Sequence, residues 1–191
     1  MLSQQQVLQY HEQGYLVLDQ MIPVETLNEL KQRAAKIVDE WKPNITTSIF
    51  TTNDNDRTGD SYFLDSAEKV RCFFEEEAFD KNGQLIEQKA LCINKIGHAL
   101  HELDPVFREF SHLPVLGAIP NDIGVDEPEI RHSMYIFKRN QCTFSSFIHY
   151  LNSCISNQHI MCIFLNAHFR EKPITQIEWW FREILIRTLS S

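Results

Sequence analysis

The first 20 residues change from a helical to an extended pattern of hydrophobic positions. Ser3 and Gln6 stand at the spacing of a capping box, which predicts a short helix beginning there. Gly14 is expected to end that helix, because glycine readily takes the left-handed conformation found at helix C-termini. The hydrophobic run YLVLDQ at residues 15–20 is then expected to form a strand.

A longer helix is predicted between Pro23 and Pro43. Proline is tolerated in a first helical turn, and hydrophobic residues then recur three or four positions apart. The recurring positions are Leu27, Leu30, Ala34, Ile37, Val38 and Trp41. Residues 44–60 are polar and rich in turn-forming residues, so we expect a loop there.

The middle of the chain predicts strands, then short helices, then another strand. Residues 62–85 indicate two short strands joined by a turn at residues 80–83. Residues 93–119 indicate two or three short helices, the second beginning at Asp104-Pro105. Residues 129–138 return to an extended pattern. Helices that lead into strands predict an α+β fold.

The last 51 residues differ from the rest in composition. Residues 1–140 contain 23 acidic and 14 basic side chains, whereas residues 141–191 contain 3 and 4. All six glycines occur at or before Gly124, and no aspartate follows Asp126. The hydrophobic positions of this segment fit neither the helical nor the strand period well, and no glycine or aspartate separates them into elements. Residues 176–189 nevertheless suggest a short amphipathic helix. We therefore expect a boundary near residue 138.

The overall composition narrows the class of protein. A net charge of −8 argues against a nucleic-acid-binding surface. The longest strictly hydrophobic run of the second half, at residues 160–165, is far shorter than the ~20 residues of a membrane span. The N-terminus lacks the pattern of a secretory signal, and five cysteines without CxxC spacing suit a reducing compartment. We expect a soluble cytoplasmic protein of one domain.

Four stretches of the sequence together resemble the phytanoyl-CoA dioxygenase family. They are HEQGYLVLDQMIPVETLNEL, GDSYFLDSAEKVRCFFEEEAFDKNG, INKIGHALHELDPVF and SMYIFK, and they cover residues 1–138 in the family's order. The resemblance implies an iron(II)- and 2-oxoglutarate-dependent oxygenase built on a double-stranded β-helix, a jelly roll. It also implies that residues 1–138 are the front half of that domain, so that the β-helix is incomplete here.

The iron-binding motif of that family is missing from these 191 residues. The family holds Fe(II) with a His-x-Asp motif and a second histidine, and an arginine binds the far carboxylate of 2-oxoglutarate. None of the eight histidines here is followed two residues later by Asp or Glu. The resemblance assigns 2-oxoglutarate contacts only to Lys95 and Met134. Taken without the resemblance, Lys95 would be expected on the solvent face of a helix.

Other candidate sites carry weaker patterns. His98 and His101, with Glu102 and Asp104 nearby, have the spacing of a metal pair on a helix, although packing or surface histidines explain them better. Further soft ligands match no zinc module: His149, Cys154, His159, Cys162 and His168. Residues 179–181, Trp-Trp-Phe, fit a partner or a membrane surface, but also simple exposed hydrophobic residues.

Three hypotheses about function follow. The first is a truncated, catalytically inactive family member, in which residues 139–191 are unrelated sequence from non-coding DNA or an alternative exon. In that case the strand at residues 134–137 has lost its partners and favours aggregation or chaperone binding. The second is a non-catalytic protein whose tail binds a partner or regulates. The third is a metal site rebuilt from the tail's histidines and cysteines. The substrate cannot be read from the sequence.

Overall fold

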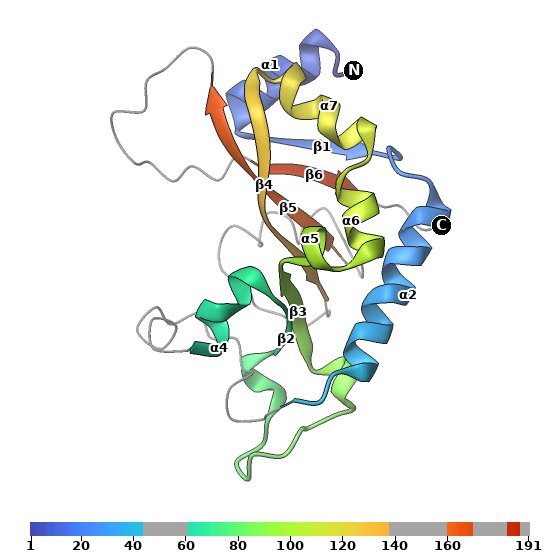
Figure 1. Cartoon of the computed structure of the whole chain (residues 1–191), viewed down its shortest axis with the longest axis vertical. Coiled ribbons are helices and arrows are strands. Elements are labelled where there is room, and N and C mark those ends of the chain that lie inside the picture. The colour runs from blue at the N-terminus through green and yellow to red at the C-terminus, as the bar shows by residue number, and fades with distance from the viewer. Residues whose placement is uncertain (44–60, 138–159, 170–182, 188–191) are drawn as a thin grey trace.

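The computed structural model describes residues 1–43, 61–137, 160–169 and 183–187 (Figure 1). The α-helices are α1 Gln4–Gln13, α2 Val24–Glu40, α4 Ser61–Leu64, α5 Leu100–Leu103, α6 Pro105–Ser111 and α7 Pro114–Asp122. The strands are β1 Tyr15–Asp19, β2 Val70–Phe74, β3 Ile93–His98, β4 Val125–Ile136, β5 Ile160–Phe169 and β6 Glu183–Arg187. Three 3-10 turns complete the described part, η1 Asp65–Glu68, η2 Glu76–Ala78 and η3 Lys89–Leu91. The helices occur together with an antiparallel sheet, so the α+β prediction is confirmed.

The N-terminal helix begins and ends where the sequence predicts. Ser3 Oγ accepts a hydrogen bond from the Gln6 backbone N–H at 3.2 Å, and Gln6 Oε1 accepts one from the Ser3 N–H at 2.9 Å. These two bonds satisfy N–H groups that the first helical turn leaves without partners. Gly14 closes the helix with φ of 81°, and strand β1 follows directly.

Helix α2 buries the predicted hydrophobic face. The buried members of that face are Leu27, Leu30, Ala34 and Val38. At the end of the helix, Lys89 Nζ donates to the backbone oxygens of Asp39 at 2.9 Å and of Trp41 at 2.8 Å. A lysine at this place satisfies carbonyl groups that the last turn leaves open. It also ties the segment before β3 to α2.

Four strands form one antiparallel sheet in the order β2-β3-β4-β5. The prediction of helices across residues 93–119 is therefore wrong at its start, because Ile93–His98 is strand β3. All six of its residues are buried, and a short run buried on both faces shows no period that separates strand from helix. The helices that follow were predicted correctly, and α6 begins at Pro105 with Asp104 as its N-cap.

The two strands predicted for residues 62–85 are replaced by one. Residues 61–68 are helical and β2 follows. The remainder holds η2 and an isolated bridge between Phe79 and Leu85 across the predicted turn, but no second strand. Residues 61–68 also cover the outer edge of β2. There Tyr62 Oη donates to the Cys72 carbonyl at 3.0 Å, and the Arg71 guanidinium donates to the Tyr62 carbonyl. An edge strand covered in this way is a poor template for pairing with another chain.

The expectation that the strand at residues 134–137 lacks partners is wrong. On one side β4 pairs with β3, from Lys95 opposite Ile136 to His98 opposite Ser133. On its other side β4 pairs with β5 along most of its length. The short helix predicted for residues 176–189 is also wrong where the structure describes it, because Glu183–Arg187 is strand β6, paired in parallel with β1. Its sequence EILIR contains two β-branched residues, which favour a strand.

One face of the sheet packs on the helices and forms the main core. Phe74, Ile96 and Tyr135 from three neighbouring strands contribute to it, together with Phe107 of α6. Figure 1 shows α2 and α6 on this side of the sheet and α4 on the opposite side. Cys72 is a free thiol in the same core, and burial raises its pKa to about 12, so it remains a protonated, unreactive side chain.

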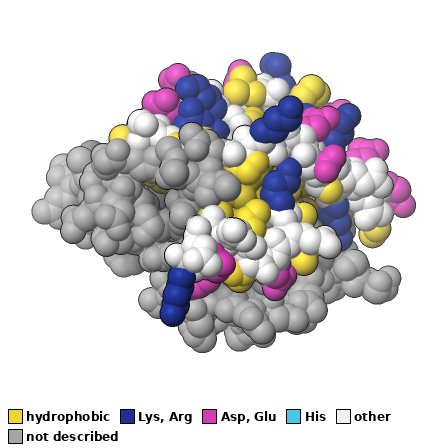
Figure 2. Space-filling model, turned by 90° about the horizontal axis from the view of Figure 1, so that it is seen from below, with side chains coloured by type: hydrophobic (Ala, Val, Ile, Leu, Met, Phe, Trp, Pro, Cys, Tyr) yellow, Lys and Arg dark blue, Asp and Glu magenta, His cyan; other side chains and the backbone are white. Residues whose placement is uncertain are grey.

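A second, smaller core joins the N-terminus to the end of α7. Its buried members are Tyr10, Leu16, Leu18, Ile119, Ile123 and Val125. Figure 1 shows α1, β1 and α7 together at one end of the molecule. Seen from below, the described surface carries hydrophobic side chains among charges of both signs (Figure 2). Within the described ranges, no helix combines the length and the apolar character needed to cross a bilayer.

Candidate functional site

Lys95 is a buried lysine on strand β3. Only 6% of its surface is exposed, so the expectation of a solvent-facing lysine on a helix is wrong. Its Nζ lies 5.5 Å from the ring centroid of Phe73 and 5.7 Å from that of Phe63. Both distances fall within the range of cation–π attraction, which offsets part of the cost of burying an ammonium group. The strand and these two rings therefore fix where the charge stands.

Met134, the other residue assigned by resemblance, lies on the neighbouring strand. It is registered opposite Gly97. A Cβ atom added at Gly97 would stand 3.3 Å from Met134 Cγ, so the methionine side chain passes closely over the glycine. Because Lys95 and Gly97 are two residues apart on β3, they share one face of the sheet. The structure thus brings Lys95 and Met134 to the same face, on the side away from α2.

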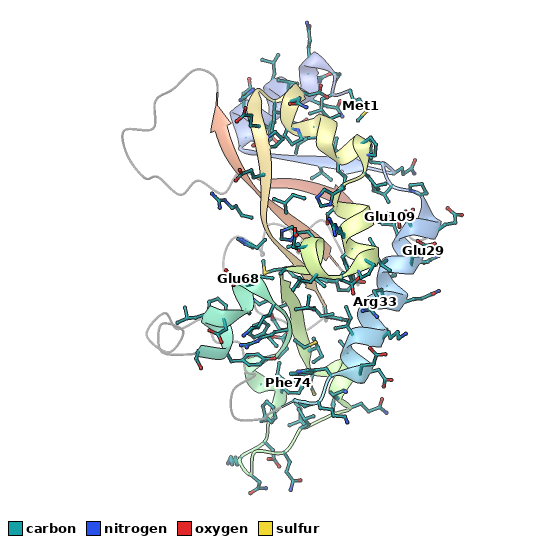
Figure 3. The ribbon with its side chains drawn as sticks, in the orientation of Figure 1. Met1, Glu29, Arg33, Glu68, Phe74 and Glu109 are labelled. Carbon is teal, nitrogen blue, oxygen red and sulfur yellow. The ribbon has the colours of Figure 1, made fainter. Side chains whose placement is uncertain are left out.

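His98 is held in one tautomer by Ser66. The Ser66 hydroxyl donates its single hydrogen to the Phe63 carbonyl at 2.5 Å. Ser66 Oγ also lies 2.7 Å from His98 Nδ1, and with its hydrogen already used it accepts this bond. Nδ1 of His98 therefore carries the hydrogen, and Nε2 keeps its lone pair. Residues 61–68 bring Ser66 to one side of the sheet, where Glu68 is labelled in Figure 3. Phe74 belongs to the core on the other side, together with residues of α2.

His132 completes the group of basic side chains beside Lys95. Its ring centroid lies 5.9 Å from that of His98, and the two rings meet edge to face. Burial, together with the charges of Lys95 and His132, lowers the pKa of His98 to about 3. Burial, Lys95 and His101 also lower the pKa of His132. Both imidazoles are therefore neutral near pH 7.

His101 belongs to a separate hydrogen-bonded group. It lies in α5, where its backbone N–H donates to Ser133 Oγ at 3.0 Å and its Nδ1 lies 2.9 Å from the same oxygen. Burial lowers the pKa of His101, while Glu102 and a hydrogen bond to the Ile130 backbone act in the opposite direction. His101 is thus fixed to Ser133, whereas His98 is fixed to Ser66.

The less favoured reading of His98 and His101 as a metal pair gains no support, because the two side chains belong to separate hydrogen-bonded groups. Asp104, the nearby carboxylate, is occupied by the N-terminus of α6 and by Arg33. Among the described residues, no group of three or more His, Cys, Asp and Glu side chains is arranged to hold a metal ion. Iron does not fit the described residues of the face that carries Lys95, because the two imidazoles there have no carboxylate beside them to complete the family's triad, and the Lys95 ammonium group repels a cation.

Several candidates from the sequence fall outside what the structure describes. His149, Cys154, His159 and residues 179–181 lie outside the described residues. Cys162 and His168 are on β5, for which only the backbone and its register are described. Conversely, sequence reasoning missed His132, Ser66, Phe63 and Phe73. None of them shows a local spacing that signals a site, since they meet only after β2, β3 and β4 have paired.

Comparison with known proteins places the chain in a family. Residues 10–147 match the family model described as phytanoyl-CoA dioxygenase (PhyH). A phytanoyl-CoA dioxygenase of Arabidopsis thaliana is 39% identical over 130 residues, which cover 68% of this chain and 46% of that protein. The phytanoyl-CoA dioxygenase domain-containing protein 1 of Rattus norvegicus is 36% identical over 143 residues, covering 72% and 49%. A homolog of that protein from Dictyostelium discoideum is 36% identical over 140 residues, covering 73% and 50%.

The chain belongs to the phytanoyl-CoA dioxygenase family. It spans about half the length of the curated relatives it matches.

Proposed function

We propose that this chain is a family member that binds a small dicarboxylate of the 2-oxoglutarate type at Lys95 but does not carry out iron-dependent oxygenation. The observation that carries the proposal is Lys95 itself, a buried ammonium group fixed between Phe63 and Phe73 on the sheet face that also holds Met134. A fixed, largely desolvated cation attracts an anion more strongly than an exposed lysine does. The sheet would then correspond to the front strands of an incomplete double-stranded β-helix.

The expected absence of oxygenation follows from the side chains that are present to bind iron. The sequence contains no His-x-Asp or His-x-Glu, and the described residues around Lys95 offer imidazoles without a carboxylate partner for iron. In this family the iron supplies the oxidation and the keto acid supplies the electrons that activate oxygen. Without the triad, Lys95 and Met134 hold a ligand and perform no chemistry on it. Purified chain supplied with Fe(II), 2-oxoglutarate and oxygen is therefore expected to form no succinate above a metal-free blank.

Binding can be tested separately from turnover. Calorimetry with 2-oxoglutarate is expected to give a dissociation constant of about 1 mM, because one lysine acts without iron or the clamping arginine. Lys95→Met should abolish this binding. Lys36→Met is the matched control, since Lys36 is exposed on α2 and makes only a surface ion pair with Glu40 at 3.8 Å. Binding that survives Lys95→Met would contradict the assignment of the site, and chelator-sensitive succinate formation would contradict the inactive state.

A second candidate function is a non-catalytic protein in which residues after 138 form part of the fold. The pairing of β5 with β4 and of β6 with β1 favours this candidate over an unstructured tail. Hydrogen exchange distinguishes the two. Protection of Ile160–Phe169 comparable to that of Val24–Glu40, in a cooperatively melting monomer, supports a completed domain that binds a partner or regulates. Fast exchange across β5 supports a truncated chain with unrelated sequence after residue 138.

The origin of residues 139–191 has its own test. Under the first proposal they are translated non-coding sequence or an alternative exon. Genomic sequence just past codon 138 should then contain a splice donor, with an in-frame His-x-Asp farther downstream. A continuous exon through codon 191 would favour the second candidate.

A further inference from the structure

Residues 61–68 lie against one face of the sheet and the edge of β2, and we call them the strap. They comprise the single turn of α4 and the 3-10 turn η1 (Figure 1). Ser66 is only 1% exposed, whereas these strap residues are exposed: Ser61, Leu64, Asp65, Ala67 and Glu68. Helical segments this short are not stable alone, so the strap depends on its contacts with the sheet. Segments of this kind open more readily than a whole protein unfolds.

The strap joins the sheet at Lys69, which is fixed by the backbone of β3. The Lys69 carbonyl accepts hydrogen bonds from the N–H groups of His98 at 3.0 Å and Ala99 at 3.2 Å. The ladder of β2 with β3 begins only after this residue, with Val70 opposite His98, and continues away from the strap. A movement of the strap about Lys69 therefore leaves the pairing of the four strands intact.

His98 lies beneath the strap and is 8% exposed. From the strap, Ser66 Oγ lies 2.7 Å from its Nδ1, and the ring of Phe63 meets the imidazole edge to face at 5.7 Å between centroids. From the sheet, the ring centroids of Phe73 and His132 lie at 5.7 Å and 5.9 Å. The strap therefore supplies contacts that separate the imidazole from water, and its opening would hydrate that side of the ring.

His98 is kept neutral mainly by its burial. Burial is the largest cause of its low pKa, and the charged groups that add to the effect are Lys95 on β3 and His132 on β4. The strap residues that touch the imidazole are neutral, and the carboxylates of the strap, Asp65 and Glu68, are exposed to solvent. From β2 the contact is an aromatic ring. Because burial dominates, the neutral state of His98 does not require an unbalanced charge at Lys95 or His132.

We propose that the strap opens as a unit while the sheet stays folded, and that protonation of His98 favours the open form, so that mild acid uncovers the face of the sheet beneath the strap. In the open form water reaches the imidazole, which then binds a proton near its ordinary pKa of about 6.5. A proton that binds one form more tightly shifts the equilibrium toward that form. Opening also withdraws the Phe63 ring from Lys95. The proposal stands apart from the proposed function, because it does not depend on what Lys95 binds.

The test is amide hydrogen exchange of the full chain at about pH 7.0 and about pH 5.5, resolved by NMR and corrected for the pH dependence of unprotected amides. The Lys69 N–H, which donates to the Ser66 carbonyl at 3.2 Å, reports on the strap. Its opening constant should rise by about three- to eightfold at the lower pH, because the open form gains up to one proton. The amides of Ile93–His98 should stay protected. Equal opening constants of the strap at the two pH values would overturn the proposal, and so would exchange of the strap and β3 at the same rate.

Three variants separate the proton-binding group from the contacts that merely hold the strap. His98→Gln should make strap opening independent of pH, whereas His132→Gln should keep the pH dependence. Arg71→Gln is the matched control, because Arg71 holds the edge of the strap through the Tyr62 carbonyl and Asp65. It should raise the opening constant by the same factor at both pH values. A pH dependence that persists in a folded His98→Gln would overturn the role of His98. If His98→Gln does not fold, loss of the pH dependence in His132→Gln would overturn that role, and its retention would support it.

Discussion

Arg33 Nε lies 2.6 Å from Asp104 Oδ2, and this ion pair joins helix α2 to the start of α6. Asp104 is 4% exposed. Its second carboxylate oxygen accepts hydrogen bonds from the backbone N–H groups of Val106 at 3.2 Å and Phe107 at 3.3 Å. One carboxylate therefore caps a helix and fixes the position of that helix against its neighbour. Arg33, the partner on α2, is labelled in Figure 3.

Replacing Asp104 by alanine should destabilise the fold markedly. The change removes a helix cap and leaves the half-buried Arg33 without its partner, so we expect the free energy of unfolding to fall by about 2–4 kcal/mol. Asp104→Asn keeps a capping oxygen and should cost less than Asp104→Ala. Urea denaturation measures both. Glu40→Gln is the control, because Glu40 makes only an exposed ion pair and its loss should cost less than ~1 kcal/mol.

The close approach of Gly97 and Met134 predicts a measurable coupling between them. An alanine Cβ at residue 97 would stand 3.3 Å from Met134 Cγ, so the methionine has to move. Gly97→Ala should therefore be at least ~0.5 kcal/mol more favourable in a Met134→Ala background than in the wild type. A double-mutant cycle based on urea unfolding measures this difference. A coupling of zero would show that an alanine side chain at residue 97 does not contact Met134.

At a second glycine, Gly117, replacement by alanine is expected to stabilise the fold. Gly117 lies in helix α7, and a Cβ added there meets nothing within 4 Å. Gly117→Ala should raise the free energy of unfolding by about 0.5–1 kcal/mol, because alanine loses less conformational freedom in a helix. Thermal melting would detect the increase, and a decrease would mean that the α7 backbone differs from the one described.

The tautomer assigned to His98 can be observed directly. Nitrogen-15 NMR should show a protonated Nδ1 and an unprotonated Nε2 near pH 7, since Ser66 accepts the Nδ1 hydrogen. Ser66→Ala removes that acceptor and leaves a buried donor unsatisfied, which we expect to cost about 1–3 kcal/mol of stability. Ser66→Thr retains the hydroxyl and is the conservative comparison. A His98 spectrum unaffected by Ser66→Ala would exclude the hydrogen bond.

The low pKa of His98 predicts a loss of stability in mild acid. Its pKa is about 3 in the folded chain and about 6.5 when unfolded, so between these values the unfolded state binds the additional proton. The free energy of unfolding should therefore fall as the pH falls below about 6.5, by up to ~1.4 kcal/mol per pH unit from this group. Above pH 6.5 both states are neutral at His98, and the group contributes no pH dependence.

Urea unfolding at several pH values measures this slope, and a folded His98→Gln variant isolates the contribution of His98. The variant should be less sensitive to pH by about one proton in this window. The lowered pKa of His132 acts in the same direction and should leave a residual slope. If the two proteins have the same slope, His98 is not buried in its neutral form.

Local signals predicted the helical parts of this fold better than the sheet. The capping box at Ser3, the C-terminal Gly14 and the Asp104-Pro105 start of α6 depend on neighbours within a few residues, and all three appear as expected. Strand β3 was missed because both of its faces are covered, which removes the alternation that marks a strand. The pairing of β4 with β5 was missed because the intervening segment contains no Gly, Pro or Asp to signal a turn, and register depends on partners distant in sequence.

The candidate site shows the same difference between local sequence signals and contacts that join distant residues. Lys95 and Met134 were proposed by resemblance, whereas the sequence pattern alone placed Lys95 on the wrong type of element. His132 and Ser66 were not found because each becomes relevant only through a contact that spans more than 30 residues, with His98 in both cases. Such contacts depend on strand pairing and on the packing of residues 61–68 against β2. Neither can be recognised from short-range patterns in a single sequence.

The smaller core has a consequence for the order in which the chain is made. Tyr10, Leu16 and Leu18 are synthesised before their partners Ile119 and Ile123, which follow about a hundred residues later, a delay of roughly 5–20 s at ~5–20 residues per second. During that time the hydrophobic side chains of the N-terminal helix and strand have no helix α7 to cover them. These residues are therefore buried long after they are synthesised, and in the meantime they are available to a ribosome-associated chaperone.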